Sequence, residues 1–168
     1  MNAVSPSDAV CRLLRSLRHA DQPAEFYAAL ETVLQETTGY IFLTLFLIHR
    51  GETLRVFTTE DALYPIGIRK PMAQTPWGDL VIRQQKSFLA KDVKGVRSAF
   101  FDHAKIESLG CGSAISVPIV YAGRCLGVLN LNHREHHYGE EHVAIVEALA
   151  PALVPVLLDA LQRRDRAG

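Results

Sequence analysis

The chain has few cysteines, no excess charge and no long apolar run, and each absence excludes a class of protein. Three cysteines, an odd number at wide spacing, predict reduced thiols rather than a disulfide framework. Eighteen basic residues balance eighteen acidic ones, so the basic excess typical of nucleic-acid-binding proteins is missing. The longest apolar run, 40–48, falls well short of the roughly twenty residues that cross a membrane. We therefore expect a cytoplasmic protein with neither nucleic acid nor a membrane as a partner.

The sequence motifs that usually mark catalysis or metal binding are missing too. No glycine-rich phosphate loop, CxxC pair or nucleophile elbow occurs. The stretch "NHREHHYGEEH", 132–142, is rich in histidine and glutamate, but it lacks a spacing such as HExxH. Asp102 and His103 are adjacent, and neighbours on a helix point about 100° apart, so they do not form an acid–base pair. We predict no catalytic residue and no metal site.

Apolar periodicity predicts helices at both ends of a single domain. Residues 1–20 carry one apolar stripe, and a second helix is expected between Asp21 and Gly39. A long helix over 140–164 carries two apolar lines, one of them a heptad seam. We expect one line to pack against the sheet of the domain, 21–168, and the other to pack against a second subunit. The helix of residues 1–20 would join this contact, so that the two subunits form a four-helix bundle. Two prolines, at 151 and 155, require this helix to kink or to break and restart.

The middle of the chain alternates between strand patterns and irregular segments. Strands are expected over 40–50, 54–58 and 87–90, and a hairpin over 113–133 turns at Ala122-Gly123. The segment 60–74 has no clear pattern, and a loop of that length in a compact domain is usually functional. A short helix should begin at Thr75-Pro76, a loop should cover 91–98, and a helix should follow over 100–109.

The order of these elements resembles the GAF domain family. The stretch "SAISVPIVYAGRCLGVLNLNHREHHYGEEHVAIVEALA", 113–150, is similar to the signature of that family: Val-Pro in a strand, a glycine turn, "GVLNL", then an aromatic and an acidic pair. The resemblance covers roughly 22–160. It implies an α+β fold related to PAS, with a central antiparallel β-sheet of five to six strands. Terminal helices would cover one face, and a ligand pocket with loops and short helices would lie on the other.

At several positions the sequence differs from family members whose ligands are known, and these differences argue against some classes of ligand without identifying the right one. His133 stands where members that bind cyclic nucleotides have lysine. Phe101 and Asp102 stand where members that bind bilins have a Cys-His pair. The free methionine-R-sulfoxide reductases of the family use thiols of the pocket loops, and Glu107 lies at the place of their reactive cysteine. The ligand or cofactor stays unknown.

Candidate pocket residues lie in and beside the irregular middle. Aromatic side chains could form a ligand wall or simply core, and Arg69-Lys70 could hold a carboxylate or phosphate or lie in solvent. Cys111, between two glycines, could be a redox thiol or a small buried side chain. The full set of candidates is Tyr64, Arg69, Lys70, Trp77, Phe100, Phe101, His103, Cys111 and Ser113.

The resemblance implies a sensory domain rather than an enzyme. We expect it to bind a small molecule, to form a homodimer through its N- and C-terminal helices, and to act on a downstream protein partner in signal transduction. Two alternatives stay open: a thiol-dependent reductase of free methionine-R-sulfoxide, and a purely structural dimerisation module whose core is filled and has no pocket.

Overall fold

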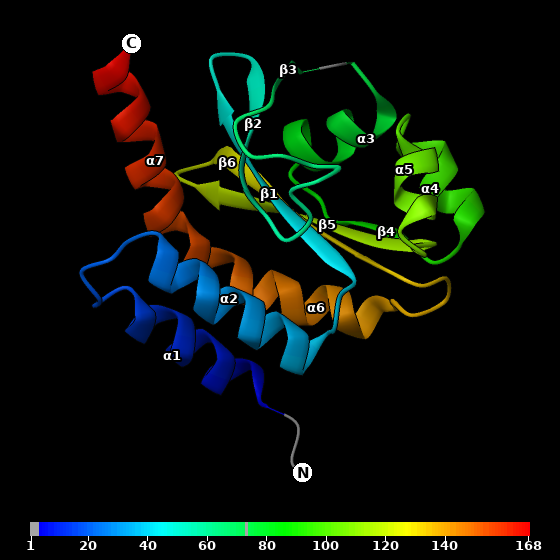
Figure 1. Ribbon diagram of the computed structural model, residues 1–168, viewed down its shortest axis with the longest axis horizontal. Helices are drawn as coiled ribbons and strands as arrows, with labels where there is room; N and C mark the ends of the chain where they lie inside the picture. Colours follow the sequence, from blue (N-terminus) through cyan, green and yellow to red (C-terminus); the bar gives the residue numbers. More distant parts are fainter. Residues whose placement is uncertain (1–3, 73) are drawn as a thin grey trace.

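The computed structural model describes residues 4–72 and 74–168, which form a six-stranded antiparallel sheet between two groups of helices (Figure 1). The strand order is β3-β2-β1-β6-β5-β4. The strands are β1 (Phe42–His49), β2 (Glu52–Thr58), β3 (Arg69–Pro71), β4 (Phe88–Ala90), β5 (Ser113–Tyr121) and β6 (Arg124–His133). Each adjacent pair is antiparallel. The α+β class and the expected sheet of five to six strands are confirmed.

One face of the sheet is covered by the terminal helices α1 (Pro6–Ser16), α2 (Ala24–Thr37), α6 (Glu140–Leu149) and α7 (Val154–Ala167) (Figure 1). Ser5 caps α1, because its hydroxyl accepts a hydrogen bond from the Asp8 amide at 3.1 Å. An ion pair between Arg12 and Glu36 joins α1 to α2. The terminal helices therefore form one layer, and they leave the other face of the sheet to the middle of the chain.

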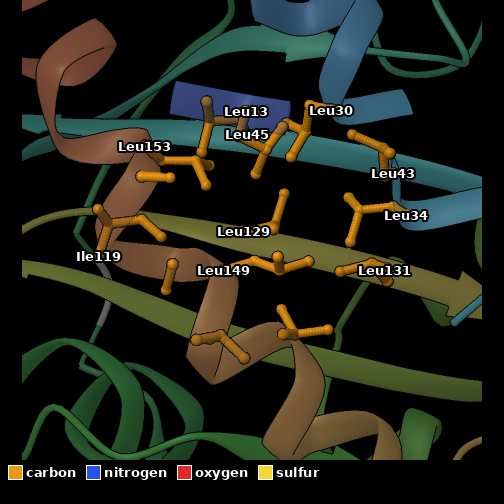
Figure 2. Packing of buried hydrophobic residues seen from close by; sticks show 14 of the residues in the cluster. Leu13, Leu30, Leu34, Leu43, Leu45, Ile119, Leu129, Leu131, Leu149 and Leu153 are labelled. Atoms are coloured by element: carbon orange, nitrogen blue, oxygen red, sulfur yellow. The ribbon is translucent and has the colours of Figure 1, made fainter. Parts of the chain in front are cut away.

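The core beneath this layer comes from alternate residues of the two central strands. Leu43 and Leu45 on β1 lie opposite Leu131 and Leu129 on β6, and all four are fully buried among leucines of the helices (Figure 2). Successive side chains of a strand point to opposite faces of the sheet. The residues between these leucines therefore point away from the helices, toward the second face.

The long C-terminal helix changes its winding where the prolines lie. A 3₁₀ turn, η2 (Ala150–Leu153), separates α6 from α7, and Pro151 and Pro155 fall in the first turns of η2 and α7, where an amide hydrogen is not needed. The helix Glu140–Ala167 is long and apolar enough by composition to cross a membrane, but its apolar side chains belong to the core of the domain.

The second apolar line of this helix is covered within the chain itself. Leu149 and Val156 are buried and Ile145 is half-buried, all in the same core cluster as residues of α1 and α2. Within the chain, α1 and α2 thus provide a packing surface for the second apolar line, and the four-helix bundle with a second subunit stays a prediction.

The second face of the sheet carries the short helices α3 (Pro76–Gly78), α4 (Val93–Ala99) and α5 (His103–Ser108), and a π-helical turn, η1 (Asp79–Arg83) (Figure 1). The loop expected over 91–98 is mostly α4, because the Asp92 carboxylate accepts from the Gly95 amide at 2.8 Å and caps a helix there. Strand β3 lies inside the segment 60–74 that lacks a pattern. Three residues, Arg-Lys-Pro, are too few and too polar to show an alternation.

The histidine-rich stretch 132–142 connects β6 to α6 and fastens this connection to the end of α2. The rings of His133 and His137 stack with centroids 3.5 Å apart, and His137 Nε2 lies 2.8 Å from the Thr38 carbonyl oxygen. The Tyr138 hydroxyl donates to the Gly39 carbonyl at 2.8 Å. Among the described residues, no group of three His, Cys, Asp or Glu side chains could hold a metal ion. These contacts give the stretch a structural role.

The stacked histidines predict a loss of stability in mild acid. Burial, followed by the neighbouring His137, lowers the pKa of His133 to about 4. In the unfolded chain its pKa is about 6.5, so protons bind the unfolded state preferentially as the pH falls from about 6.5 toward 4. The contribution of His133 to the free energy of unfolding is complete above pH 6.5 and declines across this window.

We expect His133→Phe, which keeps an aromatic ring on His137, to show a shallower decline than the wild type in urea unfolding between pH 7.5 and 4.5. The matched control is His19→Phe, at an exposed position outside the cluster. Equal slopes in the wild type and His133→Phe would contradict the prediction.

Candidate functional site

A cavity of about 160 Å³ lies between the second face of the sheet and the segments that contain β3 and α3–α5. Its wall is mainly aromatic: Phe42, Phe46, Tyr64, Trp77, Phe100 and Phe101. Its polar lining comes chiefly from the strands: Thr44, Thr53, Arg55, Asn130 and Asn132. An apolar cavity with a few polar groups is the usual form of a small-molecule site.

The aromatic wall consists of two groups of packed rings. Phe42 on β1 stacks on Tyr64 with centroids 5.1 Å apart. Trp77 on α3 packs against Phe100, with the ring centroids 6.0 Å apart. Thr75 holds Trp77 in place by capping α3, since its hydroxyl accepts from the Gly78 amide at 3.0 Å. These contacts hold the rings of each group against one another.

A chain of hydrogen bonds runs from this wall to the sheet. The Trp77 indole Nε1–H donates to Ser116 Oγ at 3.0 Å, and the Ser116 hydroxyl donates to Asn130 Oδ1 at 2.6 Å. This arrangement occupies the oxygen of the Asn130 amide and leaves its Nδ2–H₂ group as the donor available to a ligand.

Arg55 on β2 is the most unusual residue of the cavity, because it is charged and only 4% exposed. Its guanidinium carbon lies 5.2 Å from the centroid of the Phe46 ring and 5.1 Å from that of Tyr64. Its NH1 donates to the Pro65 carbonyl at 3.0 Å. Burial lowers the pKa of Arg55, which indicates that its charge is poorly compensated.

Several buried polar atoms of the cavity have no hydrogen-bond partner among the described residues: Arg55 Nε, Tyr64 Oη and Asn132 Oδ1. Burial, with the Asp102 carboxylate as the next cause, raises the pKa of Tyr64, so its hydroxyl keeps its proton and can donate. Buried polar groups are nearly always hydrogen-bonded in folded proteins. Donors and an acceptor without partners in one cavity indicate the position of a ligand or of water.

Five of the nine sequence-predicted pocket residues line this cavity, namely Tyr64, Lys70, Trp77, Phe100 and Phe101. Lys70 on β3 and Phe101, between α4 and α5, are exposed and meet at the rim, where the Lys70 Nζ atom lies 4.9 Å from the centroid of the Phe101 ring. Their roles in binding stay predictions.

The other four predicted residues lie outside the cavity lining. Arg69 precedes Lys70 on β3 and pairs with Glu52 at 3.7 Å. The Nδ1 atom of His103 lies 3.3 Å from a Glu107 carboxylate oxygen. Ser113 is fully buried, and its hydroxyl donates to the Arg134 carbonyl at 2.7 Å.

Cys111 packs in a buried cluster behind the cavity wall, together with Phe42 and Tyr64. Burial raises the pKa of its thiol to about 12, far above that of a reactive cysteine.

Sequence reasoning missed the residues that the strands present to the cavity, above all Arg55, Asn130 and Asn132. Their signal was an alternation hidden in apolar runs: Asn130 and Asn132 flank Leu131, and Thr44 lies between Leu43 and Leu45. Period-two alternation of this kind predicts which side chains share a face. The alternation alone could not show that this face encloses a cavity.

Comparison with known proteins agrees with this architecture. A family profile described as the GAF domain matches residues 21–157. The structure is similar to a GAF domain from a phosphoenolpyruvate-protein phosphotransferase of Coxiella burnetii, with a TM-score of 0.75 at 20% identity over 100% of both chains. No curated protein sequence matches the chain.

Two further solved structures have the same fold. Free methionine-R-sulfoxide reductase from Neisseria meningitidis, in complex with its substrate, has a TM-score of 0.69 at 18% identity over 97% of this chain and 96% of that one. The GAF domain of a two-component sensor histidine kinase from Bacillus halodurans has a TM-score of 0.69 at 14% identity over 84% and 97%. With the profile match over most of its length, the chain belongs to the GAF domain family.

Proposed function

We propose that this GAF domain binds a small molecule in the cavity and acts as a sensory domain in signal transduction. The observation that carries the proposal is the aromatic cavity in which polar atoms of Arg55, Tyr64 and Asn132 have no hydrogen-bond partner among the described residues. A purely structural module would have a filled core at this place. The domain of the sensor histidine kinase supports a sensory role by likeness of fold.

Strand β6 offers a direct route from the cavity to the helical layer. Asn130 and Asn132 face the cavity, and the intervening Leu131, together with Leu129, packs against the terminal helices. A ligand that bonds to these amides therefore acts on the same strand that supports α6 and α7. Such coupling requires that the ligand prefer one arrangement of this strand and its helices.

The single tryptophan makes binding measurable. Because Trp77 lines the cavity and is the only tryptophan in the chain, we expect a bound ligand to change its fluorescence. The same ligand should raise the melting temperature, since a ligand at about a hundred times its Kd adds about 2.7 kcal/mol to the free energy of unfolding.

The screen would cover organic acids, nucleotides and neutral aromatic compounds, alongside native mass spectrometry of the freshly purified protein. Titration of free tryptophan with the same compounds controls for light absorption by the ligands. A screen in which no compound changes either signal, with no retained molecule in the mass spectrum, would refute the proposed function.

The proposal includes a cytoplasmic homodimer that passes its signal to a protein partner. The exposed faces of α1 and of the helix Glu140–Ala167 are the surfaces for this contact, and Leu14 on α1 is 47% exposed. Apolar side chains that are exposed on one surface can supply the centre of an interface.

We expect light scattering after size-exclusion chromatography to give twice the chain mass of 18.6 kDa for the wild type. Leu14→Glu should reduce this value toward the monomer. Leu63→Glu, which places the same charge at a 37% exposed leucine outside the helical layer, should leave the dimer intact. A wild-type monomer at all protein concentrations would refute dimerisation.

A thiol-dependent reductase is the second candidate, favoured by the likeness of fold to the Neisseria enzyme. Such a reaction needs a nucleophilic thiolate and a second thiol that resolves the sulfenic acid. Cys111 and Cys125 are buried, and burial raises the pKa of both thiols. Cys11 is exposed, but it lies on α1, on the other side of the sheet. The three positions do not provide the required pair.

We therefore expect the purified wild-type protein to reduce free methionine-R-sulfoxide no faster than Cys111→Ser, with a chemical dithiol as reductant. The assay measures methionine by chromatography. Turnover by the wild type that disappears in Cys111→Ser would establish the reductase and overturn this expectation.

A further inference from the structure

We propose that the cavity takes a small carboxylate with an aromatic body of about one ring, and that Arg55 is the residue that binds the carboxylate. This inference rests on the proposed function and adds the class of ligand to it. It also assigns the anion site to Arg55, which is buried, instead of the exposed pair Arg69-Lys70.

The first argument is the incomplete compensation of the Arg55 charge. Its NH1 bonds to one carbonyl oxygen, its Nε has no partner among the described residues, and two aromatic rings cover its guanidinium. Cation–π contacts compensate part of the cost of burying the charge, and the Asp102 carboxylate acts on it only from a distance, so Arg55 has no counter-charge in direct contact. A ligand carboxylate would supply that contact, and its two oxygens match the planar N–H fork of arginine.

Other polar groups that line the cavity also suit a carboxylate. The buried Tyr64 hydroxyl has no hydrogen bond of normal geometry in the described part of the chain, although the nearby Asp102 carboxylate raises its pKa and competes with a ligand for its proton. The Tyr64 ring lies 5.1 Å from the guanidinium carbon of Arg55. The Asn130 amide offers its Nδ2–H₂ group to the same cavity, because Ser116 already bonds to its oxygen. All three residues therefore present donors, which is the set that an oxygen anion needs.

Asp102 sets the charge of the ligand. This carboxylate lines the cavity and opposes the loss of charge at Arg55, yet none of the ion pairs within 4.0 Å in the described structure joins it to Arg55. Asp102 repels any anion in the cavity, and the repulsion grows with the charge of the ligand, so a singly charged ligand is opposed less than a doubly charged phosphate ester. The electrostatics favour a carboxylate over a phosphate.

The rest of the cavity sets the size of the ligand. Phe42, Phe100 and Trp77 provide flat apolar surfaces, and the volume is about 160 Å³. A dry cavity of about 150 Å³ lined by aliphatic and aromatic side chains holds benzene. One ring, with its carboxylate directed at Arg55, fits this space.

The test compares benzoate with benzamide, its neutral counterpart of nearly the same shape, by titration of Trp77 fluorescence and by thermal unfolding. The variant is Arg55→Met, and the matched control is Arg69→Met, the same substitution at an exposed arginine outside the cavity lining. Phenyl phosphate serves as the doubly charged probe.

For the wild type and Arg69→Met, we expect benzoate to bind at least about tenfold more tightly than benzamide or phenyl phosphate, as hydrogen bonds to a charged group predict. In Arg55→Met this preference should vanish, while benzamide binding stays within about threefold, because an apolar side chain of similar length retains the packing. The melting temperature of unliganded Arg55→Met should equal or exceed that of the wild type, because a poorly compensated buried charge is removed.

Equal binding of benzoate and benzamide to the wild type, or undiminished benzoate binding to Arg55→Met, would overturn the inference and leave the proposed function standing. So would binding of phenyl phosphate as tight as that of benzoate. If Arg55→Met does not fold, Arg55→Lys replaces it: the point charge of lysine lacks the planar fork, so benzoate should bind more weakly than to the wild type. Binding by Arg55→Lys equal to that of the wild type would contradict the assignment.

Discussion

Alternation along β6 is the constraint on which both halves of the molecule depend. In the run Leu129, Asn130, Leu131 and Asn132, each leucine points into the helical core and each asparagine faces the cavity. A slip of one residue against β1 would place amides among the leucines of the helices and leucines against the partnerless groups of the cavity. Both errors would destabilise the fold, because each buried amide without a hydrogen bond lowers the free energy of unfolding by about 1–3 kcal/mol. One strand therefore fixes the register of the sheet, the packing of the helices and the positions of the polar groups.

The cavity differs from the core in how its polar groups are satisfied. In the core, leucines from β1, β6 and the helices fill the space, and their side chains have no polar atoms that require a hydrogen bond. In the cavity, Trp77, Ser116 and Asn130 bond to one another, and Arg55, Tyr64 and Asn132 retain atoms without a partner in the described structure. In a binding site, buried polar groups can lack partners within the protein because a ligand provides them.

The sequence predicts the architecture better than it predicts the site. The elements depend on patterns among neighbouring residues, whereas the site depends on contacts between residues far apart in the chain. Turns at Ala122-Gly123, the Thr75-Pro76 start of α3 and the apolar stripes of the terminal helices are local patterns, and they are readable in a few residues. Aromatic residues beside the irregular middle, such as Trp77 and Phe100, could be recognised as candidates because large rings in a loop need a surface to cover. Arg55 could not be recognised, because its burial depends on Phe46, Tyr64 and Pro65, which meet only in the folded chain. The same holds for β3, whose existence depends on its pairing with β2.

The two edges of the sheet bear on how the domain can associate. Both edge strands, β3 and β4, have only three residues, and β3 consists of Arg69, Lys70 and Pro71. Both edges are short, and short edge strands are poor templates for the addition of another strand. At β3 the proline also lacks a donor, and the charges of Arg69 and Lys70 would repel the same residues of a second copy, so edge-to-edge pairing between copies is most strongly disfavoured there. The two short edges therefore leave the hydrogen-bond ladder of the sheet, whose strands line the cavity, closed to strand addition from outside.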